Sequence, residues 1–279
     1  MNFTFTKAGR EWNEDRCYSC EYYAFAIDGA TGLGDEKVSD FNSDAEWYSE
    51  WWREYLIKQL QDYSRPIHEI VYNGVGMVVD EFKKLAGEKT VEIFPSAAIN
   101  IARKLENGNL EIYVLGDSPL LVQTAMGHTF EISDTLNNIN DGITLATLHY
   151  HAKQDNIPLF EARKKYAEVV AVARVTKNNQ WGYNVLSDVA EAVNKGIYKI
   201  LDGNIFKKVL LMTDGYSQCY DTFSLYSLDD FASKLDSKES AEKIYDELYN
   251  AQEKDKNAET HIRFKLRDDA TLAVLDISK

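Results

Sequence analysis

Hydrophobic residues follow two different periods in the first part of the chain. The run Tyr-Tyr-Ala-Phe-Ala-Ile at 22–27 is continuous and apolar, which predicts a buried strand that leads into Asp28. Large apolar residues then recur every four positions, which predicts an amphipathic helix over 43–63. Ser43 and Glu46 have the spacing of a capping box at the start of this helix.

The pattern continues with one more helix and then with short apolar runs. Proline suits a first helical turn and glycine a helix end, so a second helix is predicted over 66–87. Asn107 and Gly108 predict a hairpin turn. Further strands are predicted over 98–105, 110–115, 120–124, 169–175, 209–212 and 271–277, and helices over 158–168 and 237–252. This order is typical of an α+β protein in which helices cover antiparallel sheets.

Composition limits the class of protein. The chain has 279 residues, 44% of them hydrophobic, and no linker rich in proline or glycine, so we expect one domain over 1–279. The formal charge of −14 would repel the phosphates of nucleic acid, so we expect no nucleic-acid partner. The sequence shows neither an apolar run of about 18 residues nor a signal-peptide pattern. We therefore expect a cytoplasmic protein with no membrane partner.

The cysteines provide little evidence for a zinc site. Cys17 and Cys20 have C-x-x-C spacing, but Cys219 and the five histidines supply no second pair at a typical interval. Reduced thiols are the simpler interpretation.

Acidic residues stand where predicted strands meet turns. Asp28 ends an early strand, Asp117 and Asp214 each follow a strand, and Asp268 precedes the last one. Carboxylates brought together from distant segments would offer oxygen ligands to Mg²⁺ or Mn²⁺. Taken alone, each of these acids would more often be a structural turn residue than a ligand, because Asp-Gly is a common turn dipeptide.

Five short motifs carry a resemblance over nearly the whole chain. They are Asn13-Glu14-Asp15, Ala26-Ile27-Asp28-Gly29, Leu115-Gly116-Asp117-Ser118, Leu211-Met212-Thr213-Asp214-Gly215 and Asp268-Asp269-Ala270-Thr271. In this order and at about this spacing, they resemble the motifs of the metal-dependent type 2C (PPM-type) protein serine/threonine phosphatases, in a compact, bacterial-like form. The resemblance implies a four-layer αββα sandwich, with two antiparallel sheets flanked by helices.

The resemblance also implies a centre of two Mg²⁺ or Mn²⁺ ions. Asp28 would bridge both ions, and Asp214 and Asp268 would complete one of them. The carbonyl of Gly29 would help to hold the other ion, with Glu14 nearby and bound to it directly or through water. Asp269 would lie outside the ligand set.

Three further residues have roles implied in the same way. Asp15 would lie just outside the ligands or be linked to the ions through water. Asp117, together with Asp214, would contact a third, weaker ion that some relatives bind. Arg10, four residues before Glu14, would bind the substrate phosphate through its planar guanidinium.

One position departs from the family pattern. Many relatives continue Asp-Gly with a histidine that is a proposed acid for the leaving group, whereas this chain has Ala30. In its place a metal-bound water would protonate the leaving group, or Thr31 would orient it. Slow turnover on phosphoserine is consistent with the substitution, because alkoxides leave poorly without a proton.

The implied activity is hydrolysis of phosphoserine and phosphothreonine by a water that bridges the two ions. The partners would be proteins that a serine/threonine kinase has phosphorylated. Two alternatives stay open: a weakly active or inactive pseudophosphatase that binds phosphoproteins, and a hydrolase of small phosphorylated metabolites on the same fold.

Overall fold

Two five-stranded sheets form the centre of the computed structural model, which describes residues 1–30, 37–89 and 94–278. All the strand pairs are antiparallel. The first sheet has the order β1 (Phe3–Lys7), β10 (Ala270–Asp276), β9 (Phe206–Met212), β6 (Leu120–Thr124) and β7 (Thr129–Ile132). The second has the order β2 (Arg16–Ser19), β3 (Tyr23–Ala30), β4 (Ser96–Lys104), β5 (Leu110–Leu115) and β8 (Ile197–Leu201).

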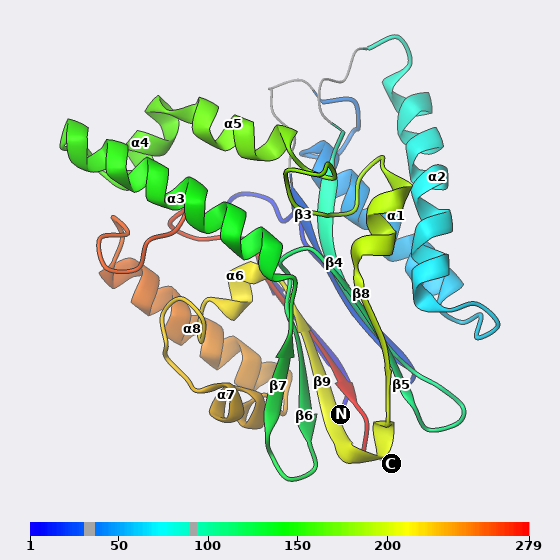
Figure 1. Cartoon of the computed structure of the whole chain (residues 1–279). Helices are drawn as coiled ribbons and strands as arrows, with labels where there is room; N and C mark the ends of the chain where they lie inside the picture. Colours follow the sequence, from blue (N-terminus) through cyan, green and yellow to red (C-terminus); the bar gives the residue numbers. More distant parts are fainter. Residues whose placement is uncertain (31–36, 90–93, 279) are drawn as a thin grey trace.

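Helices cover both outer faces of this pair of sheets (Figure 1). The long helices α1 (Asp44–Gln59) and α2 (Ile67–Ala86) pack on the second sheet. The first sheet is covered by α6 (Asp214–Ser217), α7 (Leu228–Lys234) and α8 (Lys238–Lys254). Short 3₁₀ segments, η1 (Ala190–Lys195) and η2 (Gly203–Ile205), flank β8. The expected four-layer αββα sandwich is confirmed.

Alternation along the strands separates three hydrophobic layers. In β10, Leu272 and Val274 face α7 and α8, whereas Ala273 and Leu275 lie between the two sheets. In β3, Phe25 faces α1 and α2, and its neighbours on the inner face are alanines. Because successive side chains of a strand point to opposite faces, one apolar run serves two cores.

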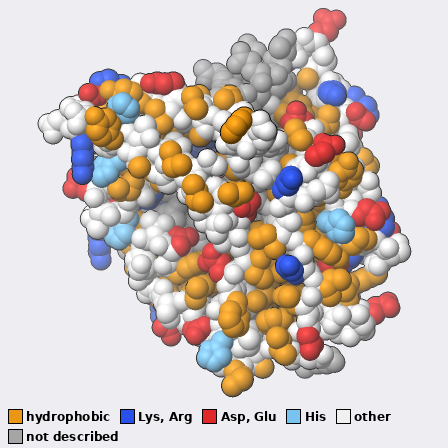
Figure 2. All heavy atoms as spheres, in the orientation of Figure 1, with side chains coloured by type: hydrophobic (Ala, Val, Ile, Leu, Met, Phe, Trp, Pro, Cys, Tyr) orange, Lys and Arg blue, Asp and Glu red, His pale blue; other side chains and the backbone are white. Residues whose placement is uncertain are grey.

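A third group of helices stands beside one end of the sandwich. It consists of α3 (Thr135–Asp155), α4 (Leu159–Lys165) and α5 (Ala167–Val175), which share a small core of their own (Figure 1). Several apolar side chains of α3 and α5 remain exposed, and Figure 2 shows hydrophobic side chains spread over this part of the surface. None of the helices in the described ranges is long and apolar enough to cross a bilayer.

Most long elements predicted from the sequence are confirmed, among them α1, α2 and the β4–β5 hairpin, in which Gly108 has a positive φ of 84°. The capping box is confirmed in one half only. Ser43 Oγ accepts from the Glu46 amide at 3.1 Å, but Glu46 Oε2 accepts from the amide of Asn42 rather than from that of Ser43.

The predicted strand over 169–175 is wrong, because this segment is helix α5. Its Val-rich sequence favours a strand, but here Val169 and Val170 pack on the small core around Leu148 and Leu159. The predicted helix over 158–168 is likewise two helices, since α4 ends at Lys165 and α5 begins at Ala167. Helix α3 and strands β1, β2, β7 and β8 were not predicted.

Candidate metal centre

Four aspartates meet at one end of the sandwich. Asp28 lies near the end of β3, and Asp117 lies in the turn between β5 and β6. Asp214 is the first residue of α6, two residues after β9, and Asp268 lies two residues before β10. All four line one cavity of about 380 Å³, which α3, α4 and α5 border on the other side. The fold therefore brings together the acidic residues that the sequence placed at strand ends.

Asn100 fixes two of these strand ends relative to each other. This buried side chain of β4 donates to the carbonyl oxygens of Ser118, Pro119 and Met212, at 3.1, 3.0 and 2.8 Å. Ser118 follows Asp117, and Met212 closes β9 just before Asp214. A single amide thus ties the second sheet to both acidic turns.

Close backbone packing at Gly215 holds Asp214 against the start of β10. A Cβ at Gly215 would lie 1.9 Å from the carbonyl oxygen of Asp269 and 3.1 Å from Cβ of Asp268. Only glycine lets the first turn of α6 approach this backbone so closely. The Asp214-Gly215 pair therefore has a packing reason as well as a chemical one.

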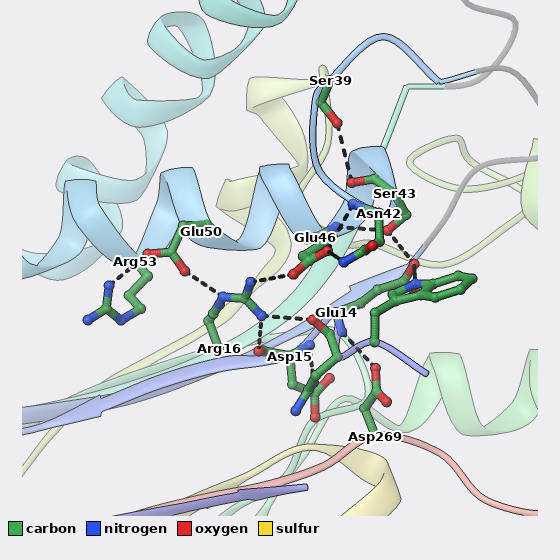
Figure 3. A network of polar contacts seen from close by, with 12 residues as sticks. Glu14, Asp15, Arg16, Ser39, Asn42, Ser43, Glu46, Glu50, Arg53 and Asp269 are labelled. Atoms are coloured by element: carbon green, nitrogen blue, oxygen red, sulfur yellow. Dashed lines mark hydrogen bonds and ion pairs between the residues drawn. The ribbon is translucent and has the colours of Figure 1, made fainter. Parts of the chain in front are cut away.

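Asp269 holds the N-terminal loop over the centre. Its Oδ1 accepts from the amide of Gly9 at 2.8 Å, and its Oδ2 accepts from the amide of Glu14 at 2.7 Å. Figure 3 shows the second of these bonds together with the polar network around Glu14. Asp269 thus faces the loop backbone, while the preceding Asp268 lines the cavity.

The Glu14 carboxylate is bound from two sides. Arg10 Nη2 donates to Glu14 Oε2 at 2.6 Å. Ser43 Oγ donates to Glu14 Oε1 at 2.5 Å (Figure 3). Trp12 Nε1 also donates to Oε1, at 3.3 Å, and its ring lies under the Arg10 guanidinium. Both Arg10 and Glu14 line the cavity.

Asp15 is buried and is not among the residues that line the cavity. Its Oδ2 accepts from Thr213 Oγ1 at 2.7 Å, and Thr213 Oγ1 in turn accepts from the amide of Thr271 at 3.0 Å. Burial, supported by the charge of Asp269, raises the pKa of Asp15 well above its ordinary value. Asp15 therefore joins the two segments that carry Asp214 and Asp268.

Without a cation, burial and mutual repulsion make the charged form of these aspartates energetically unfavourable. Burial raises the pKa of Asp28 well above its ordinary value, and the charge of Asp214 adds to the effect. Burial also raises the pKa of Asp214, followed by the charge of Asp268, although a hydrogen-bond contact with Asp28 opposes the shift. Buried carboxylates that repel each other are stabilised either by protons or by positive charge.

A lysine that the sequence analysis did not single out supplies one such charge. Lys265 Nζ lies 2.6 Å from Asp268 Oδ1, and its side chain also lines the cavity. The charges of Asp268, Asp214 and Asp28 all raise the pKa of this amine and outweigh its burial. The sequence around Lys265 contains no motif that would identify it. Its contact with the aspartates depends on the path of the loop before β10, which only the fold determines.

The helical group adds three more ionisable residues that were not predicted. Asp141 of α3, Arg163 of α4 and Arg174 of α5 all line the same cavity. Burial raises the pKa of Asp141 to about 7, with a further contribution from the charge of Asp117. The sequence contained no signal for a role of these residues, because α3 was not predicted, α5 was predicted as a strand, and no pattern placed the predicted helix over 158–168 beside the aspartates.

No family model and no curated protein matches the chain. Solved structures do. The PPM serine/threonine phosphatase MsPP of Mycobacterium smegmatis is 15% identical, with 100% of this chain and 98% of that chain covered at a TM-score of 0.55. The chain has the PPM phosphatase fold.

Two further structures support this assignment. The serine/threonine phosphatase PstP/Ppp of Mycobacterium tuberculosis is 14% identical and covers 100% of this chain and 99% of its own, at a TM-score of 0.58. PppA, a regulatory component of the type VI secretion system in Pseudomonas aeruginosa, is 15% identical and covers 99% and 97%, at 0.59. The expected fold resemblance is therefore confirmed.

The residues at this end of the PPM fold suit a divalent cation in their chemistry. Carboxylates of Asp28, Asp214 and Asp268 line one cavity, and oxygen ligands are what Mg²⁺ and Mn²⁺ prefer. Burial and mutual repulsion at Asp28 and Asp214 are relieved by positive charge. Among the described residues, however, no three His, Cys, Asp or Glu side chains are already arranged so that they could hold a metal ion together. The donors fit, but Asp268 is paired with Lys265.

Proposed function

We propose that this protein is a divalent-metal-dependent phosphatase that acts on phosphoserine and phosphothreonine in proteins. The observation that carries the proposal is the convergence of Asp28, Asp117, Asp214 and Asp268 on one cavity. Buried carboxylates that repel one another are stabilised by a cation that neutralises them. Similarity to serine/threonine phosphatases in fold supports the same reaction class.

Asp28 and Asp214 would hold the ions in this proposal, with Asp268 and the carbonyl of Gly29 completing the ligands. Asp117 and Asp141, which lie together in the cavity, would hold a third and weaker ion. The ions would supply Lewis acidity and neutralise charge on the phosphoryl group. Asn100 and Asp15 position the strand ends from below.

The substrate phosphate would also meet positive charge in the cavity. Arg10, Arg163 and Arg174 all line the cavity, and guanidinium groups bind phosphate oxygens in pairs. Three arginines on the wall of a cavity in a protein of net charge −14 support an anionic substrate. In a phosphoprotein, one of them would bind the phosphate and the others neighbouring acidic groups.

Protonation of the leaving group has no assigned residue. Ala30 lies at the cavity where relatives of this fold place a histidine, and Thr31 lies outside the described residues. Aryl phosphates should therefore be better substrates than alkyl phosphates, because a phenolate leaves without a proton more readily than a serine alkoxide.

A second function is favoured by one specific contact. The Lys265–Asp268 ion pair already neutralises one of the proposed ligands, which suits a protein that binds phosphoproteins without hydrolysing them. In that case the arginines of the cavity would bind the phosphate, and the protein would show no turnover with or without metal.

Hydrolysis of p-nitrophenyl phosphate in Mn²⁺, in Mg²⁺ and in EDTA separates these functions. We expect metal-dependent turnover that Asp214→Asn abolishes and that Asp246→Asn, an exposed aspartate of α8, leaves unchanged. Phosphopeptides and sugar phosphates would then be compared as substrates. Turnover that is equal in EDTA and in Mn²⁺ would contradict the proposal, and phosphopeptide binding without any turnover would favour the binding function.

A further inference from the structure

The Lys265 ammonium group occupies a position among the aspartates that a metal-binding site would ordinarily leave open for the metal ion. Its Nζ lies 2.6 Å from Asp268 Oδ1, the oxygen that also accepts from the amide of Asp269 at 3.0 Å. Asp214 and Asp28 line the same cavity and act on the same ammonium group. The three aspartates thus share one tethered positive charge.

The backbone on the N-terminal side of Lys265 is anchored. Phe264 packs on the small core of α3, α4 and α5, and its carbonyl oxygen accepts from Arg163 Nη1 at 3.0 Å. Arg263, which is 5% exposed, donates to Asp255 and to the carbonyl oxygen of His261. These contacts fix the backbone just before Lys265. The Lys265 side chain therefore extends to Asp268 from a held position.

An ammonium group and a divalent ion compete for the same oxygen. Lysine has donors and no lone pair in its charged form, so it cannot join a ligand set and can only be displaced from it. At a separation of about 4 Å, even a screened positive charge strongly disfavours a second cation. A cation that binds Asp268 through Oδ1 must therefore displace Lys265.

We propose that Lys265 is a built-in competitor for the divalent cation at Asp268 and Asp214. The ion at Asp28 binds first, and the second ion binds only when the ammonium withdraws. This inference rests on the proposed metal centre and adds to it that the chain limits its own metal loading. It assigns Lys265 a positioning role toward the metal site and gives it no contact with the substrate.

The competitor role makes two predictions of opposite sign for Lys265→Met. Without divalent ions the variant loses the charge that balances the aspartates, so its melting temperature in EDTA should fall. With Mn²⁺ it loses the competitor, so its affinity for the second ion should rise at least about tenfold. A lysine with a merely structural role would lower stability in both conditions and leave Mn²⁺ affinity unchanged.

The experiment is calorimetric titration of the whole chain with Mn²⁺, paired with melting curves in EDTA and in Mn²⁺. Lys265→Met and Lys265→Gln are compared with Lys256→Met, which removes an exposed lysine nearby in sequence. We expect the two Lys265 variants to gain affinity or to bind a second ion that the parent does not bind, and Lys256→Met to match the parent.

The possible results separate this inference from the proposed function. Equal Mn²⁺ affinity and stoichiometry in the parent and in both Lys265 variants would overturn the competitor role while leaving the metal centre in place. No Mn²⁺ binding by any variant, or binding that Asp214→Asn does not weaken, would overturn the metal centre and the competitor role together. Tighter binding in the Lys265 variants that Asp214→Asn abolishes supports both.

Discussion

Asp269 Oδ2 accepts a hydrogen bond from the amide of Glu14 at 2.7 Å, across a sequence separation of 255 residues. Its other oxygen accepts from the amide of Gly9. The side chain next to the proposed ligand Asp268 therefore holds the loop that carries Arg10 and Glu14. This bond explains how a segment near the N-terminus and one near the C-terminus form one wall of the cavity.

Asp269→Asn should loosen that wall. An amide keeps one acceptor oxygen but presents an NH₂ group to a backbone N–H, so we expect a loss of about 1–3 kcal/mol in the free energy of unfolding. The KM for p-nitrophenyl phosphate should also rise, because Arg10 loses its support. Urea unfolding and steady-state kinetics measure the two effects, with Asp246→Asn as the exposed control. An unchanged KM with reduced stability would limit Asp269 to a structural role.

Arg10→Ala should weaken substrate binding more than it weakens the fold. The Arg10 side chain is 42% exposed and its ion pair with Glu14 is at the edge of the cavity, so we expect at most about 1 kcal/mol of lost stability. We expect the KM for p-nitrophenyl phosphate to rise roughly tenfold, with Arg10→Lys intermediate because an ammonium is a point charge. Arg53→Ala, at a surface ion pair of α1, is the matched control. Equal KM values for Arg10→Ala and Arg53→Ala would remove Arg10 from the phosphate site.

Ala30→His should restore a proton donor for the leaving group. We expect kcat on an alkyl phosphate to rise by about tenfold or more, and kcat on p-nitrophenyl phosphate to change little, because a good leaving group needs no proton. The ratio of the two rates is the measurement. A similar increase on both substrates would show that the histidine acts in another way.

Asn100→Leu should destabilise the link between the sheets. Leucine is close to asparagine in size but leaves three buried carbonyl oxygens without this donor, so we expect a loss of about 2–4 kcal/mol in the free energy of unfolding. Urea denaturation measures it, and Asn250→Leu on the exposed face of α8 is the control. A loss below about 0.5 kcal/mol would mean that water replaces the amide at these carbonyls.

Lys208 provides a pH-dependent test that is independent of the metal centre. This buried amine of β9 donates to the carbonyl oxygen of Leu235 at 2.7 Å, and burial lowers its pKa from 10.5 to about 8. Between these values the unfolded chain binds more protons than the folded one, so the contribution of Lys208 to stability increases as the pH rises from 8 to 10.5. The upper limit of this increase is about 3 kcal/mol.

The comparison of Lys208→Met with the parent protein isolates this effect from other titrations. The parent should gain stability over the variant as the pH rises, whereas Lys207→Met, at the exposed neighbouring position, should show a constant difference. Urea unfolding at several pH values between 7 and 10.5 measures the two curves. Parallel curves for all three proteins would contradict the lowered pKa.

The sequence by itself determined the α+β class, most of the long elements, and the acidic residues at strand ends. Helix α1 and strand β10 follow from local periodicity, and Asp28 and Asp214 stand out because a strand end and a turn are visible in a few consecutive letters. The resemblance in motifs added the four-layer arrangement, which the structure confirmed.

Only the tertiary structure decided what surrounds these aspartates. The segment over 167–175 is a helix because it packs on α3 and α4, although its valines favour a strand when they are read alone. Lys265, Asp141 and Arg163 reach the cavity from loops and helices that carry no motif. The physical reason is that periodicity reports burial along one element, whereas a charge is assigned its role by partners that lie far away in sequence and close together in space.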